Sequence, residues 1–182
     1  VTGSSLSSTL GATNTCAITA IRLGDSNYND SVAATQTVTI AKASQVTAMT
    51  VPSGVTMVYG SAGLDLSTLS YSGGDGTGAY TFSTSTPGCT ISTNTLTSTN
   101  NAAATCSVSV VKAADANYAA SPAGTMLVTI TQATQTALVV TATSATYGST
   151  LALTSTGGDG TGAVTWSVVS GSCTMATTTL TP

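Results

Sequence analysis

Short runs in which apolar residues alternate with small polar ones recur along the chain. The clearest lie at residues 105–111 (TCSVSVV), 125–131 (TMLVTIT), 79–83 (AYTFS) and 138–143 (LVVTAT). Successive side chains of a strand point to opposite faces, so such a run buries one face and leaves the other to water. No stretch of useful length shows an apolar stripe at helical spacing. The pattern predicts an all-β fold in which short strands pack as an immunoglobulin-like β-sandwich.

The chain also repeats itself. Residues 25–45 (DSNYNDSVAATQTVTIAKASQ) match residues 115–135 (DANYAASPAGTMLVTITQATQ) at an offset of 90 positions. The heptapeptide GGDGTGA stands at residues 73–79 and again at residues 157–163, an offset of 84. Self-similarity at a nearly fixed period marks a repeated structural unit. The repeat predicts tandem modules of about 90 residues, a size typical of a β-sandwich domain.

The phase of this repeat divides the chain into three parts. Residues 45–132 hold one complete module, residues 1–44 the second half of a module, and residues 133–182 the first half of another. Two accounts fit this phase. In one, the chain is an excerpt from a longer tandem array. In the other, the half at residues 133–182 joins the half at residues 1–44 of the next molecule. Both accounts give a linear row of modules.

The repeated glycine loop is predicted to be a turn. Its central residues in the two copies are Gly73, Gly74, Asp75 and Gly76, and Gly157, Gly158, Asp159 and Gly160. Glycine allows positive φ, and Asp favours turns. A phosphate-binding loop would lead into a helix and usually carry a Lys, whereas strand-like YTFS and VTWS follow these two copies. Because Asp75 and Asp159 belong to separate modules, we do not expect them to act as a carboxylate pair.

The four cysteines fall into two sets. Cys89 and Cys106 lie in the complete module, and we expect a disulfide between them that cross-links neighbouring strands. Such a bond is typical of proteins in an oxidising compartment. A metal site would need four close ligands such as CxxC pairs or His, and the chain has no His. Cys16 and Cys173 are the counterparts of Cys106 and Cys89 in the two half-modules. They would form an inter-subunit pair if the halves join.

Composition narrows the classes of function. Only 5% of the residues are charged, and three of them are basic. Nucleic-acid binding takes clustered Lys and Arg, and no apolar run approaches the ~20 residues of a membrane span, so neither partner is expected. The chain has no Glu or His to serve as an obvious general base near neutral pH. We therefore expect no catalytic residue and no cofactor. A surface so poor in charge is open to lateral packing of subunits or to glycans on Ser and Thr.

Two further motifs have simpler structural explanations. GDSNYND at residues 24–30 spaces its Asp and Asn oxygens in a way similar to a calcium loop, but its counterpart, ADANYAA, keeps only the first Asp and Asn. We expect Asx turns at both places, with calcium as the alternative at the first. An isopeptide bond from Lys112 is not expected, because its counterpart is Arg22, which cannot substitute in that reaction.

Taken together, the motifs resemble those of a known group of repeats. They are VYG at residues 58–60, TYG at 146–148, the GGDGTGA loops, CT followed by TLT, ATC at 104–106, KAADANYAAS at 112–121 and the closing VTI. Over essentially the whole chain this set resembles the immunoglobulin-like tandem modules of large bacterial surface and secreted proteins, the bacterial Ig-like and YDG/MBG-type repeats.

The resemblance implies architecture and location. It implies a structural subunit or segment of an extracellular or cell-surface filament, fibre or adhesin stalk, built from head-to-tail modules and without catalysis. The partners implied are copies of the same chain or adjacent modules of one polypeptide. The alternative function is a carbohydrate- or receptor-binding module of a surface adhesin. A binding module of that kind would show an exposed aromatic cluster or a distinctive loop in one module only.

Overall fold

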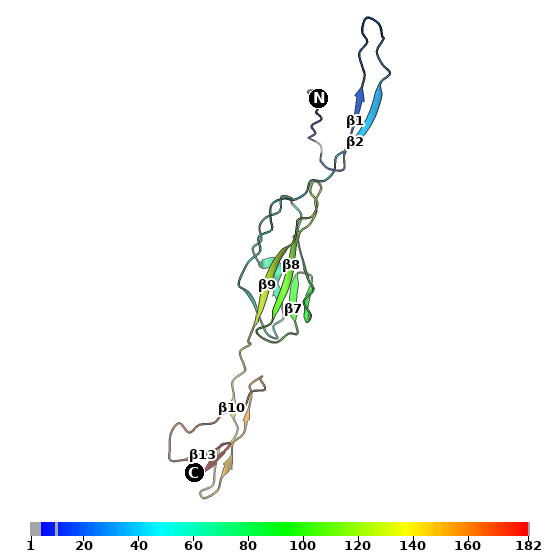
Figure 1. The fold of residues 1–182 in the computed structure, drawn as a ribbon. Coiled ribbons are helices and arrows are strands. Elements are labelled where there is room, and N and C mark those ends of the chain that lie inside the picture. The colour runs from blue at the N-terminus through cyan, green and yellow to red at the C-terminus, as the bar shows by residue number, and fades with distance from the viewer. Residues whose placement is uncertain (1–4, 10, 182) are drawn as a thin grey trace. The chain divides into compact units, whose positions relative to one another are not determined.

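The fold is almost entirely β. A computed structural model describes residues 5–9 and 11–181 (Figure 1). These residues form several sheets, and none of them lies in an α-helix. By its internal contacts the chain divides into two compact units, Val1–Gln132 and Ala133–Pro182. The all-β class expected from the alternating pattern is confirmed.

Two sheets form within residues 45–132, which we call the central module. The first is four-stranded, in the order β3 (Val55–Val58), β9 (Gly124–Thr131), β8 (Thr105–Lys112) and β5 (Tyr80–Thr84). The second is three-stranded, in the order β4 (Leu64–Asp65), β7 (Thr95–Ser98) and β6 (Cys89–Ser92), and a 3-10 helix, Leu66–Thr68, follows β4. Neighbouring strands pair antiparallel except β3 and β9, which are parallel.

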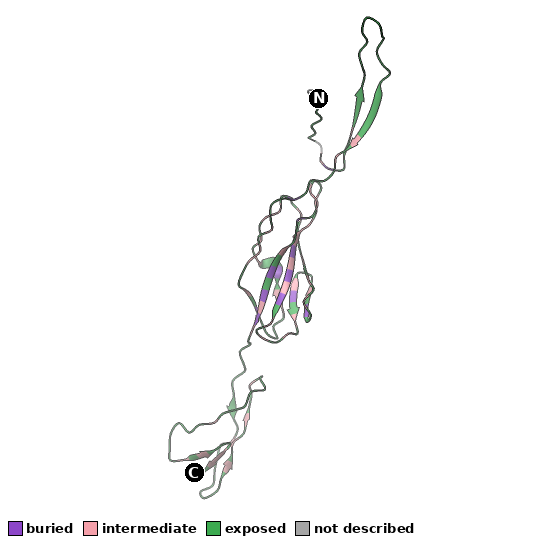
Figure 2. Cartoon of the chain, in the orientation of Figure 1, coloured by how far each residue is buried: buried purple, intermediate pink, exposed green. Residues whose placement is uncertain are grey.

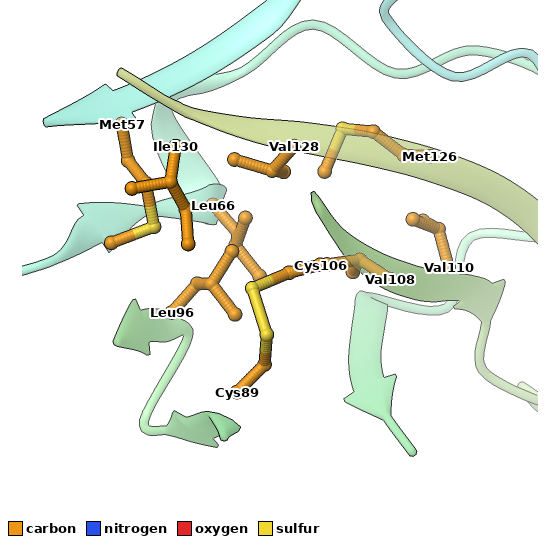
Figure 3. Packing of buried hydrophobic residues seen from close by; sticks show 10 residues of the cluster. All are labelled: Met57, Leu66, Cys89, Leu96, Cys106, Val108, Val110, Met126, Val128 and Ile130. Carbon is orange, nitrogen blue, oxygen red and sulfur yellow. A yellow bond between two sulfur atoms is a disulfide. The ribbon is translucent and has the colours of Figure 1, made fainter. Parts of the chain in front are cut away.

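One core of ten buried side chains is shared by these sheets (Figure 3). Every second residue of β8 and β9 faces it, as the alternating pattern predicts. The ten are Met57, Leu66, Cys89, Leu96, Cys106, Val108, Val110, Met126, Val128 and Ile130. Both sheets contribute, so each covers the apolar face of the other. This arrangement is compatible with a β-sandwich.

A disulfide joins Cys89 of β6 to Cys106 of β8, with 6.0 Å between the Cα atoms. This is the pair that the sequence indicates for the complete module. The bond crosses from the three-stranded sheet to the four-stranded sheet, rather than linking neighbouring strands of one sheet. Both cysteines are buried. The disulfide therefore fixes the two sheets against each other through the core.

Residues 11–44 form a hairpin of two strands, β1 (Thr15–Ala20) and β2 (Ala34–Thr39), in a sheet of their own. Its register repeats that of β8 and β9: Cys16 lies opposite Val38 as Cys106 lies opposite Val128. The residues of the hairpin are much more exposed than those of β8 and β9, as Figure 2 shows. Ile18 is 39% exposed, whereas its counterpart Val108 is fully buried. The hairpin therefore has the same strand pairing as β8 and β9. Among the described residues, no second sheet covers its apolar face.

The second unit forms two small sheets. One pairs β10 (Val139–Val140) with β12 (Ser155–Thr156), and the other has the order β11 (Leu151–Ala152), β14 (Thr179–Thr181) and β13 (Thr174–Ala176). The pairing of β11, β14 and β13 is that of β4, β7 and β6. None of the described residues of this unit is fully buried. It therefore repeats the smaller sheet of the central module without that module's closed core.

Removing the disulfide should weaken the central module. The double variant Cys89→Ala, Cys106→Ala loses a cross-link that spans 17 positions, and the chain-entropy estimate gives a loss of about 3 kcal/mol in the free energy of unfolding. Urea unfolding followed by circular dichroism measures this loss. The matched control is Cys16→Ala, Cys173→Ala, which removes the two free cysteines. Equal stability of both variants would contradict the role assigned to the bond.

Candidate functional site: the joint between modules

The glycine loop keeps one backbone shape in both copies. Gly73 has φ 91° and Gly157 has φ 90°, values that favour glycine. A Cβ atom on Gly73 would collide with the carbonyl oxygen of Ala48, and one on Gly157 with that of Ala137. In both copies the loop therefore lies tightly against the segment that precedes it in the repeat, which we call the entering segment.

Asp75 ties this loop to the entering segment. Its Oδ2 accepts hydrogen bonds from the backbone N–H groups of Val46 (2.6 Å) and Thr47 (3.0 Å), and its Oδ1 accepts one from the Thr47 hydroxyl. These hydrogen bonds, the Thr47 hydroxyl first, hold the pKa of Asp75 below its usual value. Asp159 repeats the arrangement in part, because its Oδ2 accepts from the N–H of Thr136 at 2.7 Å.

Gln45 is a further anchor that the sequence reasoning missed. Its side chain is 3% exposed. The amide nitrogen donates to the carbonyl of Ala119 (2.6 Å), and Oε1 accepts from the N–H of Gly76 (3.3 Å). Gln135 makes the same contact with Gly160, also at 3.3 Å. The signal was present in the repeat, since both copies have Gln at this position.

Asp115 joins the loop between β8 and β9 to the glycine loop. Its Oδ1 accepts from the backbone N–H groups of Asn117 (2.9 Å) and Tyr118 (2.8 Å), which is an Asx turn. Its Oδ2 accepts from both the N–H and the hydroxyl of Thr77. The Thr77 N–H is the largest of the causes that hold the pKa of Asp115 well below its usual value. This carboxylate therefore bridges two loops at one end of the central module.

The hairpin carries the same Asx turn at Asp25, whose Oδ1 accepts from the N–H groups of Asn27 (2.8 Å) and Tyr28 (3.0 Å). Asp30 accepts from the N–H of Gly24 at 2.7 Å. The Asx turns expected at Asp25 and Asp115 are therefore present. In the described part of the chain, no three His, Cys, Asp or Glu side chains gather where they could hold a metal ion.

Asn117 connects the hairpin to the central module. Its Oδ1 accepts from the N–H of Ala12 at 3.0 Å, and its carbonyl oxygen accepts from the N–H of Ala43 at 2.9 Å. The carbonyl of Ala43 in turn accepts from the N–H of Ala119 at 2.8 Å. Both ends of the hairpin therefore bond to the one loop that Asp115 shapes. We call these hydrogen bonds of Ala12 and Ala43 with Asn117 and Ala119 the joint.

An aromatic cluster lies beside a depression of the central module. The ring of Tyr71 is 5.3 Å from the rings of both Tyr80 and Phe82, centroid to centroid. The cluster borders a shallow depression of ≈ 570 Å³ whose lining includes Ser67, Ser70 and Asn94. The Tyr71 hydroxyl donates to the carbonyl of Leu66 at 2.9 Å, and burial raises the pKa of this phenol. The rings also pack against the core.

Cys16 and Cys173 are both free and partly exposed within the chain. Cys16 lies on β1 and Cys173 directly precedes β13. Their counterparts, Cys106 and Cys89, form the disulfide of the central module. The structure thus contains one joined pair and the two separate members of an equivalent pair.

The carboxylate at the glycine loop should make stability depend on pH. Because the folded pKa of Asp75 is lowered, its contribution is present above the unfolded value of about 3.9 and is lost as the pH falls toward the folded value. We expect Asp75→Asn to lower the melting temperature at pH 7 by more than Asp159→Asn does. The deficit of Asp75→Asn should shrink as the pH falls below the unfolded value toward the lowered folded pKa, because wild-type Asp75 then takes up a proton. A deficit that is the same at pH 7 and pH 2 would contradict this account.

The described part of the chain contains no helix long and apolar enough to cross a membrane. Comparisons with protein-family models, with curated proteins and with solved structures find no match to this chain. The geometry of the described residues is therefore the basis for assigning a function.

Proposed function

We propose that this chain is a load-bearing structural segment of an extracellular bacterial filament, fibre or adhesin stalk. In this proposal it is a row of immunoglobulin-like β-sandwich modules without catalytic activity, and its partners are neighbouring modules or copies of itself. The observation that carries the proposal is the parallel pairing of β3 with β9, the first and last strands of the central module.

Parallel pairing of these strands decides how the module responds to a pull along the chain. The ladder runs from Val55 opposite Val128 to Val58 opposite Thr131. Because both strands point the same way, drawing the two ends of the module apart slides one strand backward along the other. The hydrogen bonds of the ladder are then loaded together rather than one after another. The Thr131 hydroxyl, which donates to the carbonyl of Met57 at 3.2 Å, adds to this ladder.

The disulfide supports both the mechanical role and the location. It joins the two sheets, so the chain between Cys89 and Cys106 cannot extend under load while the bond is intact. Disulfides persist in oxidising surroundings such as the cell exterior. A module held in this way resists both unfolding and extension after unfolding.

The surface supports contact with like molecules. Only 5% of the residues are charged, so side-by-side packing meets little charge repulsion. Leu127, on the outer face of β9, is 58% exposed, and Tyr59, just beyond β3, is 48% exposed. Lateral packing of modules would cover these side chains. The many Ser and Thr hydroxyls also offer attachment points for glycans.

The direction of pulling should matter to the central module. With handles at residues 45 and 132, single-molecule force measurements load β3 and β9 in shear. With handles at residues 102 and 132, the pull peels β8 from β9 one bond at a time, because these two sites lie at the same end of that antiparallel pair. We expect a clearly higher unfolding force for the first pair of handles. Equal forces would contradict a load-bearing role.

The same measurement has an internal check. Reduction should lengthen the unfolded central module by roughly 50 Å, since it releases the 17 positions between the cysteines at about 3.4 Å per residue. An unchanged length would show that the disulfide does not limit extension.

Sugar binding is a second candidate function, and one observation favours it. The cluster of Tyr71, Tyr80 and Phe82 occurs in the central module alone, because the corresponding positions of the second unit carry Ser155, Val164 and Trp166. Apolar walls with a few polar groups are typical of ligand sites.

Titration with oligosaccharides, followed by NMR of the aromatic rings, tests the sugar-binding candidate. Binding would shift the Tyr71, Tyr80 and Phe82 resonances and leave the fully exposed ring of Tyr147 unchanged. The absence of shifts at millimolar sugar would eliminate this candidate for the oligosaccharides tested.

A further inference from the structure

We propose that the hairpin of residues 11–44 in one chain completes residues 133–181 of a second copy. The two parts form one module with two sheets, sealed by a disulfide between Cys16 of the first chain and Cys173 of the second. This inference rests on the proposed function and names the partner that continues the row.

The hairpin offers an uncovered apolar face. It has the register of β8 and β9, so Ile18 and Val38 stand where Val108 and Val128 stand in the central module. Val108 and Val128 are fully buried under the three-stranded sheet, whereas Ile18 is 39% exposed. The hairpin therefore presents the face that such a sheet covers in the central module.

The second unit offers the matching sheet. In β11, β14 and β13, Leu151 lies opposite Leu180 as Leu64 lies opposite Leu96. Leu96 is fully buried against β8 and β9, but Leu180 is only partly buried. Residues 133–181 thus carry the smaller sheet, and the hairpin carries the two strands that cover it in the central module. This complementarity points to a second copy as the occupant.

Polar contacts match as well. In the central module, Thr77 donates two hydrogen bonds to Asp115. Thr161 has the position of Thr77 in the second glycine loop, and Asp25 has the position of Asp115 in the hairpin. Joining the parts as in the central module brings Thr161 of one chain to Asp25 of the other. This contact involves neither the apolar faces nor the cysteines, so it supports the same partner independently.

The joint would recur at the new module. Asn117 accepts hydrogen bonds from Ala12 and Ala43. Its counterpart in the hairpin is Asn27, and the counterpart of Ala43 is Ala133. When the hairpin of one chain docks on residues 133–181 of a second chain, Asn27 of the first therefore lies beside Ala133 of the second, as Asn117 lies beside Ala43 within one chain. The described part of each copy has one uncovered hairpin and one uncovered smaller sheet. A head-to-tail contact between such parts builds an open row when it does not close on itself.

The covalent step balances with a small disulfide as oxidant. The thiols of Cys16 and Cys173 lose two protons and two electrons as their S–S bond forms. Oxidised glutathione accepts them, its own S–S bond breaks, and two molecules of reduced glutathione leave. The equivalent bond in the central module spans 6.0 Å between Cα atoms, within the usual range for a disulfide.

Two single variants of the full chain test the pairing. A Cys16→Ala chain retains Cys173, and a Cys173→Ala chain retains Cys16. The two are mixed in a glutathione redox buffer, alkylated, and analysed by non-reducing gels and peptide mass spectrometry. We expect the mixture to give a disulfide-linked dimer and nothing larger, joined through Cys16 and Cys173. Wild type should give a ladder of oligomers, and each variant alone should stay monomeric.

A matched pair of substitutions tests the apolar face. In the Cys173→Ala chain, Val38→Asp places a charge at the position of buried Val128, whereas Thr37→Asp places it at the position of Leu127, which is 58% exposed. We expect at least a tenfold slower dimer formation with Val38→Asp and little change with Thr37→Asp. The intact Cys89–Cys106 bond and an unchanged circular dichroism spectrum show that the central module stays folded in both.

Several outcomes would overturn the inference. They are dimers formed by either variant alone, equal rates for Val38→Asp and Thr37→Asp, and wild-type monomers with free thiols or with Cys16 bonded to Cys173 of the same chain. Monomers with free thiols would indicate that a different polypeptide segment covers these faces. The force measurement on the central module does not depend on this pairing. A module that resists shear without any dimer would therefore overturn the second copy as partner and leave the load-bearing role in place.

Discussion

Covering the apolar face of each sheet is the constraint on which this structure depends. A strand that alternates apolar and polar residues makes a sheet with one face that water disfavours. In the central module two such sheets cover each other, and Val108, Val128 and Leu96 become fully buried. Where only one of the two sheets is present, as in the hairpin and in the second unit, the equivalent positions stay partly exposed. The same local sequence thus gives a closed core or an open face, depending on what lies opposite.

The polar contacts determine where the sheets and turns meet. Gln45, Asp75 and Asp115 each accept hydrogen bonds from backbone N–H groups of loops. They hold the glycine loop against the entering segment and against the loop after β8. The ends of the hairpin bond to this same region. In the row of modules that we propose, each new module would bring both the glycine loop and the groups that hold it.

Much of this architecture can be predicted from the sequence, and there are physical reasons why the remaining features cannot. The alternating runs at residues 105–111 and 125–131 correspond to β8 and β9, and in the glycine loop Gly73 and Gly157 have the positive φ that glycine allows. The run at residues 138–143 forms only the two-residue strand β10, because a strand needs neighbours as well as alternation. The parallel pairing of β3 with β9 and the anchoring role of Gln45 arise from contacts between residues far apart in the chain. Local pattern carries no information about such contacts.

Amide hydrogen exchange of the two equivalent hairpins tests the central claim most directly, since it reports the covering of each strand pair separately. In the monomeric Cys173→Ala chain with its Cys89–Cys106 bond intact, the account predicts slow exchange for residues 105–112 and 124–131 and fast exchange for residues 15–20 and 34–39. In the oxidised assembly, it predicts that residues 15–20 and 34–39 become nearly as slow as their counterparts. Slow exchange of that hairpin in the isolated monomer, or fast exchange in the assembly, would contradict the account.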